Sequence, residues 1–413
     1  MIHIAPGPLA GRLRAPASKS HLQRLLLAAS QAEGTSLLRN PGDSADGRAC
    51  LEVVRGLGAR AERDGERIRI TGHAAPRARE LDCGESGFCL RAAAAVAALG
   101  GESLLLARGS LRGRPMDMVL EPLRQLGARC EAEGGLPPLR VRGPLKGGTV
   151  TVDGRASSQF LSGLLLALPL AEGDSRVEVV GLRSGPYVRM TLDVLAAFGA
   201  RVRASADLSL IEVPGGQRYR PVDLDVEGDW SGAAFLLAAG AVAGDVAVEG
   251  LDPRSAQADR AVVEALGAAG ADLAWEGGAL RARRSDLAGF AFDATDCPDL
   301  FPPLAALACH ARGTTRLKGA SRLRAKESDR AEALVTELTA LGGRLSLEGD
   351  WMVIEGGPLE GGRVDPRNDH RIAMAGALAA LRSRRGVHMD GEGCVDKSYP
   401  SFFRDLESLR GEP

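Results

Sequence analysis

Basic side chains stand where helices are expected to begin, a position that ordinarily favours negative charge. Lys19, Ser20 and Arg24 open one apolar helical stretch, and Arg371 opens another just after His370. The first turn of a helix presents free N–H groups and the positive end of the helix dipole, so it attracts anions and disfavours cations. Serines at these places are most simply N-caps. Lys19 and Arg371 are not explained by capping, and they predict a bound anion.

Four more basic residues fall at junctions between loops and helices: Arg114, Lys326, Arg330 and Lys397. Each of them alone is most simply a solvated surface charge. The chain holds only five lysines among its 52 basic residues, however, and three of the five, counting Lys19, lie at such junctions. Lysine is a compact ammonium group whose pKa can shift, a property that arginine lacks. The concentration of lysines therefore favours a functional role.

Two carboxylates accompany these cations. Asp299 stands at the start of an expected helix, and Glu327 directly follows Lys326. An aspartate at a helix start is usually an N-cap, and the pattern alone favours that interpretation for Asp299. Beside cations that bind a phosphorylated substrate, a carboxylate can also serve as a general acid or base.

The helix starts that carry these residues recur along the sequence, because the chain consists of repeats. Each repeat has a small or polar cluster, an apolar helical stretch, a glycine turn and a short strand. Successive clusters lie about 70 residues apart, and this regular spacing indicates a repeated unit. The clusters are marked by Ser20, Gly87, Ser158, Ser231, Asp299 and His370.

A second helix follows in each repeat and ends in a glycine turn, as in Leu57-Gly58-Ala59 and Leu341-Gly342-Gly343. Glycine readily adopts the left-handed conformation that ends a helix. The turns lead into alternating stretches such as residues 67–70, which are typical of strands. Each repeat therefore predicts the order βαβαββ, six times over, and the sixth ends early.

The alternation of strands and helices predicts an α/β protein of two domains, each with three repeats. Helical stretches such as residues 161–171 are apolar nearly all round, which predicts buried helices with sheets outside. The domain boundary is expected near residues 225–228. One domain then comprises residues 16–226, and the other comprises residues 1–15 and 227–413, with residues 9–15 supplying a strand.

Composition excludes several classes of protein. A chain of 413 residues with 45% hydrophobic and 25% charged residues is typical of a globular protein of two or three domains. The formal net charge of −1 argues against a general nucleic-acid binder. No apolar run reaches the roughly 18 residues of a membrane helix, and residues 1–7 do not resemble a signal peptide.

The sequence also offers no pattern for a metal or an organic cofactor. Seven cysteines without a CxxC pair argue against a disulfide framework or a zinc site, and they favour a reducing cytoplasm. Residues 56–61 fit the loose dinucleotide fingerprint, but they close a helix instead of following a strand. The six histidines lack metal-ligand spacing.

The ordered series of motifs resembles the enolpyruvyl transferases over nearly the whole chain, from about Arg14 to Leu406. Any one motif is a weak signal, whereas the series in this order is a strong one. The motifs are Ser18-Lys19-Ser20 with Arg24, Arg114-Pro115, Ser157-Ser158-Gln159-Phe160, Ser184-Gly185-Pro186-Tyr187, Pro298-Asp299, Lys326-Glu327-Ser328-Asp329-Arg330, Asn368-Asp369-His370-Arg371 and Lys397-Ser398-Tyr399-Pro400.

The resemblance implies two domains that close over the substrates, with the active site in the cleft between them. The motifs are most similar to those of members that act on shikimate 3-phosphate. These transfer the enolpyruvyl group of phosphoenolpyruvate to the 5-hydroxyl of shikimate 3-phosphate, and release phosphate through a tetrahedral intermediate. The resemblance further implies a cytoplasmic, monomeric enzyme of aromatic amino-acid biosynthesis that uses no cofactor and binds neither nucleic acid nor membrane.

The resemblance also assigns residues to each substrate. Shikimate 3-phosphate would be held by Lys19, Ser20, Arg24, Ser157, Ser158, Ser184, Tyr187, Asp299 and Lys326. Phosphoenolpyruvate would be held by Lys19, Gly87, Arg114, Gln159, Arg330, Arg371 and Lys397. Glu327 would donate a proton to the enol group, Asp299 would remove one from the hydroxyl, and Lys19 would help phosphate to leave.

The chain departs from the family's usual pattern at several positions. Glu85, Ser86, Gly87 and Phe88 stand where the family more often has Asn-Ala-Gly-Thr. Ala92 stands in place of proline and Arg322 in place of asparagine. A carboxylate at Glu85 would repel a bound phosphate unless it is paired with arginine or protonated.

Two other functions stay open. An enolpyruvyl transferase acting on UDP-N-acetylglucosamine would carry a reactive cysteine in a long loop around residues 108–118, and no cysteine is present there. A non-enzymatic clamp built of repeats should carry equivalent residues in every repeat, whereas the polar markers here differ between repeats. Phosphate release in the presence of both substrates distinguishes an enzyme from a clamp.

Overall fold

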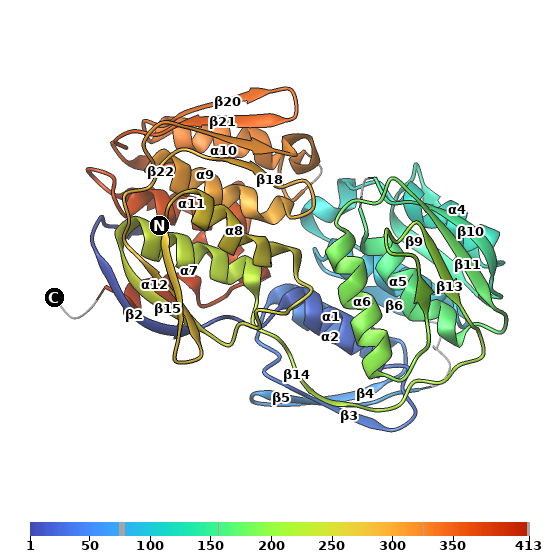
Figure 1. Ribbon diagram of the computed structural model, residues 1–413. Helices are drawn as coiled ribbons and strands as arrows, with labels where there is room; N and C mark the ends of the chain where they lie inside the picture. The colour runs from blue at the N-terminus through green and yellow to red at the C-terminus, as the bar shows by residue number, and fades with distance from the viewer. Residues whose placement is uncertain (74–78, 156, 325, 411–413) are drawn as a thin grey trace. The chain divides into compact units, whose positions relative to one another are not determined.

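The computed structural model describes residues 1–73, 79–155, 157–324 and 326–410 (Figure 1). The chain forms two compact units. The continuous unit comprises Ala17–Val226, and the discontinuous unit comprises Met1–Pro16 together with Glu227–Pro413. The chain therefore passes from one unit to the other twice, after Pro16 and after Val226.

The continuous unit contains three groups of elements, each built around one four-stranded sheet. The first group is α1 (Lys19–Ala29), β3 (Thr35–Arg39), α2 (Ala45–Gly56), β4 (Arg60–Asp64), β5 (Arg67–Thr71) and β14 (Asp223–Asp225). The second is β6 (Glu80–Asp82), α3 (Gly87–Ala97), β7 (Glu102–Leu106), η1 (Gly109–Gly113), α4 (Asp117–Gln125), β8 (Arg129–Glu133) and β9 (Leu136–Arg142). The third is β10 (Gly148–Asp153), α5 (Gln159–Ala167), η2 (Leu168–Leu170), β11 (Ser175–Val180), α6 (Gly185–Ala197), β12 (Arg203–Ala204) and β13 (Leu210–Val213).

The discontinuous unit contains the other three groups. The fourth is β2 (Leu9–Arg14), α7 (Trp230–Ala243), β15 (Gly244–Glu249), η3 (Ala258–Ala261), α8 (Val262–Ala268), β16 (Asp272–Glu276) and β17 (Ala279–Arg283). The fifth is β18 (Ala291–Asp293), η4 (Pro298–Leu300), α9 (Phe301–Cys309), β19 (Thr314–Lys318), η5 (Ala320–Leu323), α10 (Arg330–Ala340), β20 (Arg344–Glu348) and β21 (Trp351–Glu355). The sixth is β22 (Gly362–Val364), α11 (His370–Ala380), β23 (Val387–Met389), η6 (Glu392–Lys397), α12 (Phe402–Ser408) and β1 (Ile2–Ile4).

The six sheets share one pairing pattern. In the fourth group, β2 pairs in parallel with β15, β15 pairs antiparallel with β17, and β17 pairs antiparallel with β16. The first, second, third and fifth groups repeat this order, whereas the sixth has the three-stranded order β22–β23–β1. The predicted βαβαββ repeat and the early end of the sixth are thus confirmed.

Three of the sheets are completed by strands from distant parts of the chain. The predicted strand near the N-terminus is β2, and it pairs in parallel with β15, a partner that the sequence did not predict. The sequence did not predict that β14 would pair in parallel with β3, or that β1 would pair antiparallel with β23. Because β2 and β1 join the discontinuous unit and β14 joins the continuous one, each unit contains all the strands of its own sheets.

The glycine turns end the second helices as predicted. All five of these glycines have a positive φ, in the left-handed region that glycine enters without a steric penalty. They are Gly58 (109°), Gly127 (89°), Gly199 (82°), Gly270 (81°) and Gly342 (96°).

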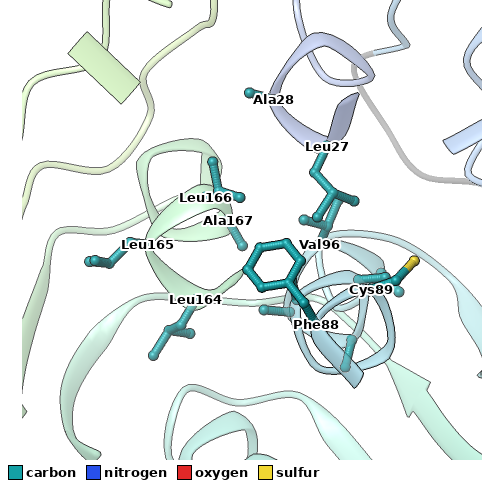
Figure 2. Packing of buried hydrophobic residues seen from close by; sticks show 14 of the residues in the cluster. Leu27, Ala28, Phe88, Cys89, Val96, Leu164, Leu165, Leu166 and Ala167 are labelled. Atoms are coloured by element: carbon teal, nitrogen blue, oxygen red, sulfur yellow. The ribbon is translucent and has the colours of Figure 1, made fainter. Parts of the chain in front are cut away.

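The first helix of each repeat is buried inside its unit, and the sheets lie outside (Figure 1). In the continuous unit α1, α3 and α5 contact one another, and Figure 2 shows Leu27, Val96 and Leu164 from these three helices within one apolar cluster. In the discontinuous unit α7, α9 and α11 contact one another in the same way. Every residue of α3 and α7 is buried, so the predicted buried helices are confirmed.

The contact between α3 and α5 is close enough to require a small residue. A Cβ added to Gly163 would lie 2.2 Å from the Cα atom of Ala92. Real Cβ atoms do not approach a backbone so closely, so glycine is needed at this crossing. Ala92, which departs from the family's usual proline, is therefore part of the packing that holds the starts of α3 and α5 together.

Candidate active site

The sixteen residues assigned by resemblance divide between the two units. The continuous unit contains Lys19, Ser20, Arg24, Gly87, Arg114, Ser157, Ser158, Gln159, Ser184 and Tyr187. The discontinuous unit contains Asp299, Lys326, Glu327, Arg330, Arg371 and Lys397. Within each unit, residues that are far apart in the sequence lie together.

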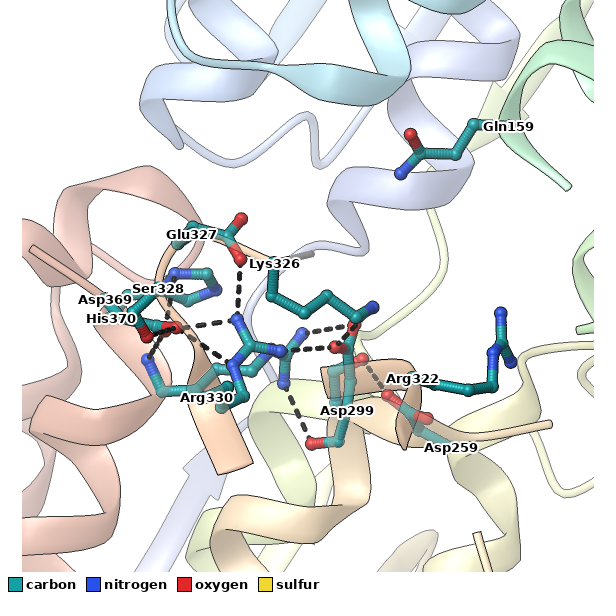
Figure 3. Close-up of polar contacts among 12 residues, drawn as sticks. Gln159, Asp259, Asp299, Arg322, Lys326, Glu327, Ser328, Arg330, Asp369 and His370 are labelled. Atoms are coloured by element: carbon teal, nitrogen blue, oxygen red, sulfur yellow. Dashed lines mark hydrogen bonds and ion pairs between the residues drawn. The ribbon is translucent and has the colours of Figure 1, made fainter. Parts of the chain in front are cut away.

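Arg330 is the central residue of the group in the discontinuous unit (Figure 3). It is the first residue of α10, and its side chain is only 1% exposed. Its guanidinium donates to Asp369 at 2.9 and 3.1 Å, to Glu327 at 2.7 Å and to Asp299 at 2.8 Å. Burial acts to lower the pKa of Arg330, but the charges of these three carboxylates outweigh it and raise the pKa above its ordinary value.

Asp299 is paired with three cations. Besides Arg330, its carboxylate lies 3.4 Å from Lys326 Nζ and 3.2 Å from Arg371 Nη2. The N-cap position of η4 belongs to Cys297. The Asp299 carboxylate therefore faces cations from α11 and from the segment that leads into α10, and it does not cap its own helix.

Glu327 lies between two cations. Its Oε2 atom accepts from Arg330, and its Oε1 atom is 3.9 Å from Lys397 Nζ at the end of η6. Burial lowers the pKa of the neighbouring Lys326, with the Asp299 charge acting in the opposite direction. The segment before α10 thus brings the carboxylate of Glu327 into contact with Arg330 and the ammonium group of Lys326 into contact with Asp299.

Asp369 completes this group, although the sequence did not assign it a role. It N-caps α11 by accepting from the backbone N–H of Arg371 at 3.0 Å, and it also accepts from Ser328 Oγ at 3.1 Å. The two residues before it, Arg367 and Asn368, have φ values of 51° and 55°. Left-handed backbone is uncommon for such residues and is often found at functional sites. An Asp before an apolar helix indicated only a cap, so its pairing with Arg330 was not predicted.

The cations at helix starts have carboxylate partners in the protein. Lys19 Nζ lies 3.0 Å from Asp46, in the first turn of α2, and Arg371 pairs with Asp299. The negative charge that the sequence argument required is therefore supplied by the chain itself. A cation at a helix start does not, on its own, indicate a bound anion here.

A polar network connects the starts of three helices in the continuous unit. Gln23 of α1 donates to the carbonyl of Asp46 at 3.0 Å and to Ser86 Oγ at 2.8 Å. Ser86 N-caps α3 by accepting from the backbone N–H of Cys89 at 3.3 Å. Through Asp46, the network fixes Lys19 relative to the start of α3. Gln23 and Asp46 were not predicted as site residues.

Arg24 is a buried cation whose bonding partners are neutral oxygens. Its side chain is 2% exposed, and its guanidinium lies 4.4 Å from the centre of the Phe88 ring. Its acceptors are Thr191 Oγ1 at 2.8 Å, Ser162 Oγ at 3.1 Å and the carbonyls of Ser20 at 2.7 Å and Tyr187 at 3.2 Å. Burial lowers the pKa of Arg24 to about 9, with the Tyr187 charge opposing the shift. A buried positive charge with neutral partners attracts an anion.

Ser184 has a strained backbone beside this arginine. It occupies the N-cap position of α6 with φ 58° and ψ 41°, and it is buried. Its carbonyl accepts from the N–H of Tyr187 at 3.1 Å, and the carbonyl of Tyr187 in turn binds Arg24. A serine in left-handed conformation persists only where its surroundings hold it.

The start of α3 brings together three predicted residues and one that was missed. A Cβ on Gly87 would lie 3.1 Å from Arg91 Nη1, 3.3 Å from Arg114 Nη1 and 3.5 Å from Gln159 Oε1. Arg91 also donates to Gln159 Oε1 at 2.7 Å. Arg91 was not predicted, although its position four residues after Gly87 places it on the same face of the helix. Two guanidinium groups thus lie beside a helix N-terminus, an arrangement suited to anions.

Two serines lie at the start of α5, next to Gln159. Ser157 Oγ accepts from the backbone N–H of Gln159 at 3.2 Å. Ser158 is buried and occupies the N-cap position. Both residues therefore belong to a helix N-terminus, as the sequence pattern predicted.

The departures from the family pattern have structural explanations. A Cβ on Gly109 would lie 2.3 Å from the Glu85 carboxylate, so this side chain packs against the start of η1. Phe88 presents its ring to Arg24, and Arg322 donates to the carbonyl of Thr295.

The described part of the chain has three further features that bear on function. It contains no group of three or more His, Cys, Asp or Glu side chains arranged to hold a metal ion. None of its helices combines the length and the apolar character needed to cross a bilayer. The seven cysteines are free thiols.

Comparison with known proteins identifies the family. A family model described as EPSP synthase (3-phosphoshikimate 1-carboxyvinyltransferase) matches residues 4–406. Proteins named 3-phosphoshikimate 1-carboxyvinyltransferase from Methanocorpusculum labreanum and Halobacterium salinarum are 39% and 42% identical to the chain; the matches cover 98% of this chain and 97% and 98% of theirs. A solved EPSP synthase structure from Acinetobacter baumannii superposes with a TM-score of 0.82 at 30% identity, covering 98% of this chain and 97% of that one. The motifs, the sixfold βαβαββ fold and these likenesses agree, and the chain belongs to the EPSP synthase family.

Proposed function

We propose that this chain transfers the enolpyruvyl group of phosphoenolpyruvate to the 5-hydroxyl of shikimate 3-phosphate and releases phosphate. The observation that carries the proposal is the gathering of Asp299 and Glu327, both partly buried, around the buried Arg330, together with further cations. These residues come from motifs that match a family whose members bear the name of this reaction.

Binding of shikimate 3-phosphate is assigned mainly to the continuous unit. Arg24, buried among neutral oxygens, supplies a positive charge for the phosphate. Ser157 and Ser158 add hydroxyl groups at the start of α5, whose free N–H groups also favour an anion. Ser20, Ser184 and Tyr187 belong to the same surroundings, because the backbone of Ser20 and of Tyr187 binds Arg24. Lys326 and Asp299 are proposed to contact the ring hydroxyls.

Binding of phosphoenolpyruvate is assigned to cations of both units. In the continuous unit, Gly87, Arg114 and Gln159 surround the start of α3, with Lys19 at the start of α1. The discontinuous unit contributes Arg330, Arg371 and Lys397. We propose that both units act on the same pair of substrates, because the substrates together carry two phosphates and two carboxylates that need several cations. Enclosure by these cations excludes water and strengthens each electrostatic contact.

The reaction is an addition followed by an elimination. Glu327 donates a proton to the methylene carbon while the acceptor oxygen bonds to the enol carbon, and Asp299 takes the hydroxyl proton. In the resulting tetrahedral adduct, phosphate leaves with the help of Lys19, and the Glu327 carboxylate, which gave up its proton in the addition, takes a proton back from the methyl group and so restores the double bond. Asp299 begins as a carboxylate because three cations stabilise its charge. Anionic substrates draw on the same cations, so their binding makes Asp299 a stronger base.

Phosphate release on mixing the protein with phosphoenolpyruvate and candidate acceptors tests the proposal. We expect release with shikimate 3-phosphate and nearly complete loss of activity in Lys19→Met. Lys146→Met, at a lysine that none of the motifs includes, is the matched control and should keep wild-type activity. Release with UDP-N-acetylglucosamine alone would assign the other acceptor. If no acceptor supports release and neither substrate changes the melting temperature, the clamp interpretation gains. Full activity in Lys19→Met would remove Lys19 from the mechanism.

The proposal includes a monomer that works in the cytoplasm without a metal or an organic cofactor. Seven free cysteines support a reducing compartment. The two carboxylates and the cations described above are sufficient for the proton transfers and for phosphate departure. Light scattering checks the oligomeric state, and turnover after dialysis against a chelator should be unchanged.

A further inference from the structure

Asp259 is a buried carboxyl group next to the proposed active site that none of the recognised motifs includes. It lies in η3 with 0% of its surface exposed. Its Oδ2 atom accepts from Ser231 Oγ of α7, the interaction drawn as a dashed line in Figure 3. Within the described structure its Oδ1 atom has no hydrogen-bond partner. An ionised carboxylate that is fully buried ordinarily accepts several hydrogen bonds or pairs directly with a cation.

The groups around Asp259 favour its neutral form. Burial is the largest effect, and the charges of Asp299 and Asp229 act in the same direction. Arg371 and the Ser231 hydrogen bond oppose them, and the net result raises the pKa of Asp259 to about 7. These neighbours come from η4, from the residue that caps α7, and from α7 and α11. The geometry favours the neutral form as well, because Asp259 is fully buried and its Oδ1 atom has no hydrogen-bond partner within the described structure.

The state of Asp259 decides the net charge beside the substrate. Four cations and three carboxylates are linked by ion pairs in the described part of the discontinuous unit's group. The cations are Lys326, Arg330, Arg371 and Lys397, and the carboxylates are Asp299, Glu327 and Asp369. An ionised Asp259 makes the charge beside this group more negative by one unit than a protonated Asp259 does.

We propose that Asp259 is a positioning residue that works in its protonated form and keeps Arg371 available to phosphoenolpyruvate. This inference rests on the proposed function. When Asp259 loses its proton, the new negative charge attracts Arg371 and repels the incoming anion. Because this charge acts through its electrostatic effect on Arg371, it should weaken binding of the ground state and the transition state alike. KM for phosphoenolpyruvate then rises while kcat stays nearly constant.

The variant Asp259→Asn tests this directly, because an amide has nearly the same shape and is neutral at every pH. We expect the wild-type KM for phosphoenolpyruvate, relative to that of Asp259→Asn, to rise about tenfold between pH 6 and pH 9. Titration of the substrate and of other enzyme groups is common to both proteins and cancels in the ratio. Asp286→Asn, at an exposed aspartate paired with Arg312, is the matched control and should follow the wild type. A ratio that does not change with pH would overturn the inference.

Thermal unfolding of the substrate-free protein gives a second readout that needs no activity. A carboxyl group whose pKa rises on folding contributes stability that is complete below about pH 4 and is lost as the pH rises through about 7. The melting temperature of the wild type should therefore fall more between pH 5 and pH 8 than that of Asp259→Asn.

The two readouts separate failure of this inference from failure of the proposed function. If the melting temperatures of the wild type and of Asp259→Asn change with pH in the same way, Asp259 is not held protonated. That result would overturn the inference even if the enzyme is active. Absence of turnover with shikimate 3-phosphate would overturn the proposed function and, with it, the substrate assigned to Arg371. Three results together support both the inference and the proposed function. They are normal turnover, a ratio of the two KM values that changes with pH, and melting temperatures of the two proteins that diverge as the pH rises.

Discussion

Arg330 illustrates how single residues make this site both charged and buried. Its guanidinium binds carboxylates from three segments: Glu327 just before α10, Asp299 in η4 and Asp369 before α11. Removing these charges from water costs free energy, which the ion pairs recover only while all of them are present. Loss of Arg330 therefore leaves the fully buried Asp369 without its ion pair.

The variant Arg330→Met should destabilise the protein strongly. Asp369 is fully buried and would keep only its hydrogen bonds from Ser328 and the helix start. We expect the free energy of unfolding to fall by about 3–5 kcal/mol in urea titrations. Arg344→Met, where the ion pair with Glu355 is exposed on both sides, should change it little. Equal effects of the two substitutions would contradict the assigned role of burial.

Single residues also show which parts of the site could be predicted from the sequence and which could not. Lys19, Arg371 and Asp299 were identifiable because their types are unusual at a helix start or fit a motif. Asp46, Asp369 and Asp259 were missed. An aspartate near a helix start indicates a cap, and only the folded chain shows whether it is buried and which cation it meets.

Among the elements of the fold, the N-termini of helices position the residues of the site, and the packing between helices positions these N-termini. The N-termini of α1, α3 and α5 carry Lys19, Gly87 and Gln159. These helices pack against one another, and Gly163 allows α5 to approach Ala92 of α3. Precise packing at this crossing therefore determines how closely Gln159 lies to Gly87 and Arg91.

The variant Gly163→Val tests that packing. Its side chain would have to displace the backbone of α3, so we expect a loss of about 1–3 kcal/mol in the free energy of unfolding and a higher KM for phosphoenolpyruvate. Gly267→Ala is the control: this glycine lies inside α8 with no atom near its added Cβ. Alanine there should stabilise the protein by about 0.5–1 kcal/mol. Tolerance of valine at position 163 would show that the crossing is looser than described.

Elements were predictable where the sequence carries a periodic signal. The glycine turns at Gly58 and Gly342 and the alternating strands indicated the repeat correctly. The pairing of β14 with β3 and of β1 with β23 was not predictable, because three-residue strands carry no period and their partners lie far away in the sequence.

In the molecule as a whole, the path of the chain makes the stability of the continuous unit independent of the other unit. The continuous unit is one uninterrupted segment, Ala17–Val226, whose last strand, β14, completes the sheet of its first repeat. Its apolar cluster is drawn from within the same segment. It therefore has the complete sheets and the apolar core that an independent domain requires.

We expect a fragment of residues 17–226 to fold alone. Its circular dichroism should show mixed helix and strand, and it should unfold in a single cooperative transition in urea. A fragment that ends at residue 220 lacks β14, exposes the edge of β3, and should be less stable. If the longer fragment has no cooperative transition, the continuous unit depends on the rest of the chain.

We propose that residues of both units act on one pair of substrates. A crystal structure of the protein with shikimate 3-phosphate and an unreactive analogue of phosphoenolpyruvate is the decisive experiment. We expect Arg24 and Ser158 to contact the shikimate phosphate, and Asp299 and Arg371 to reach the same two ligands. Ligands held by residues of one unit alone, with the other cations turned to solvent, would contradict it.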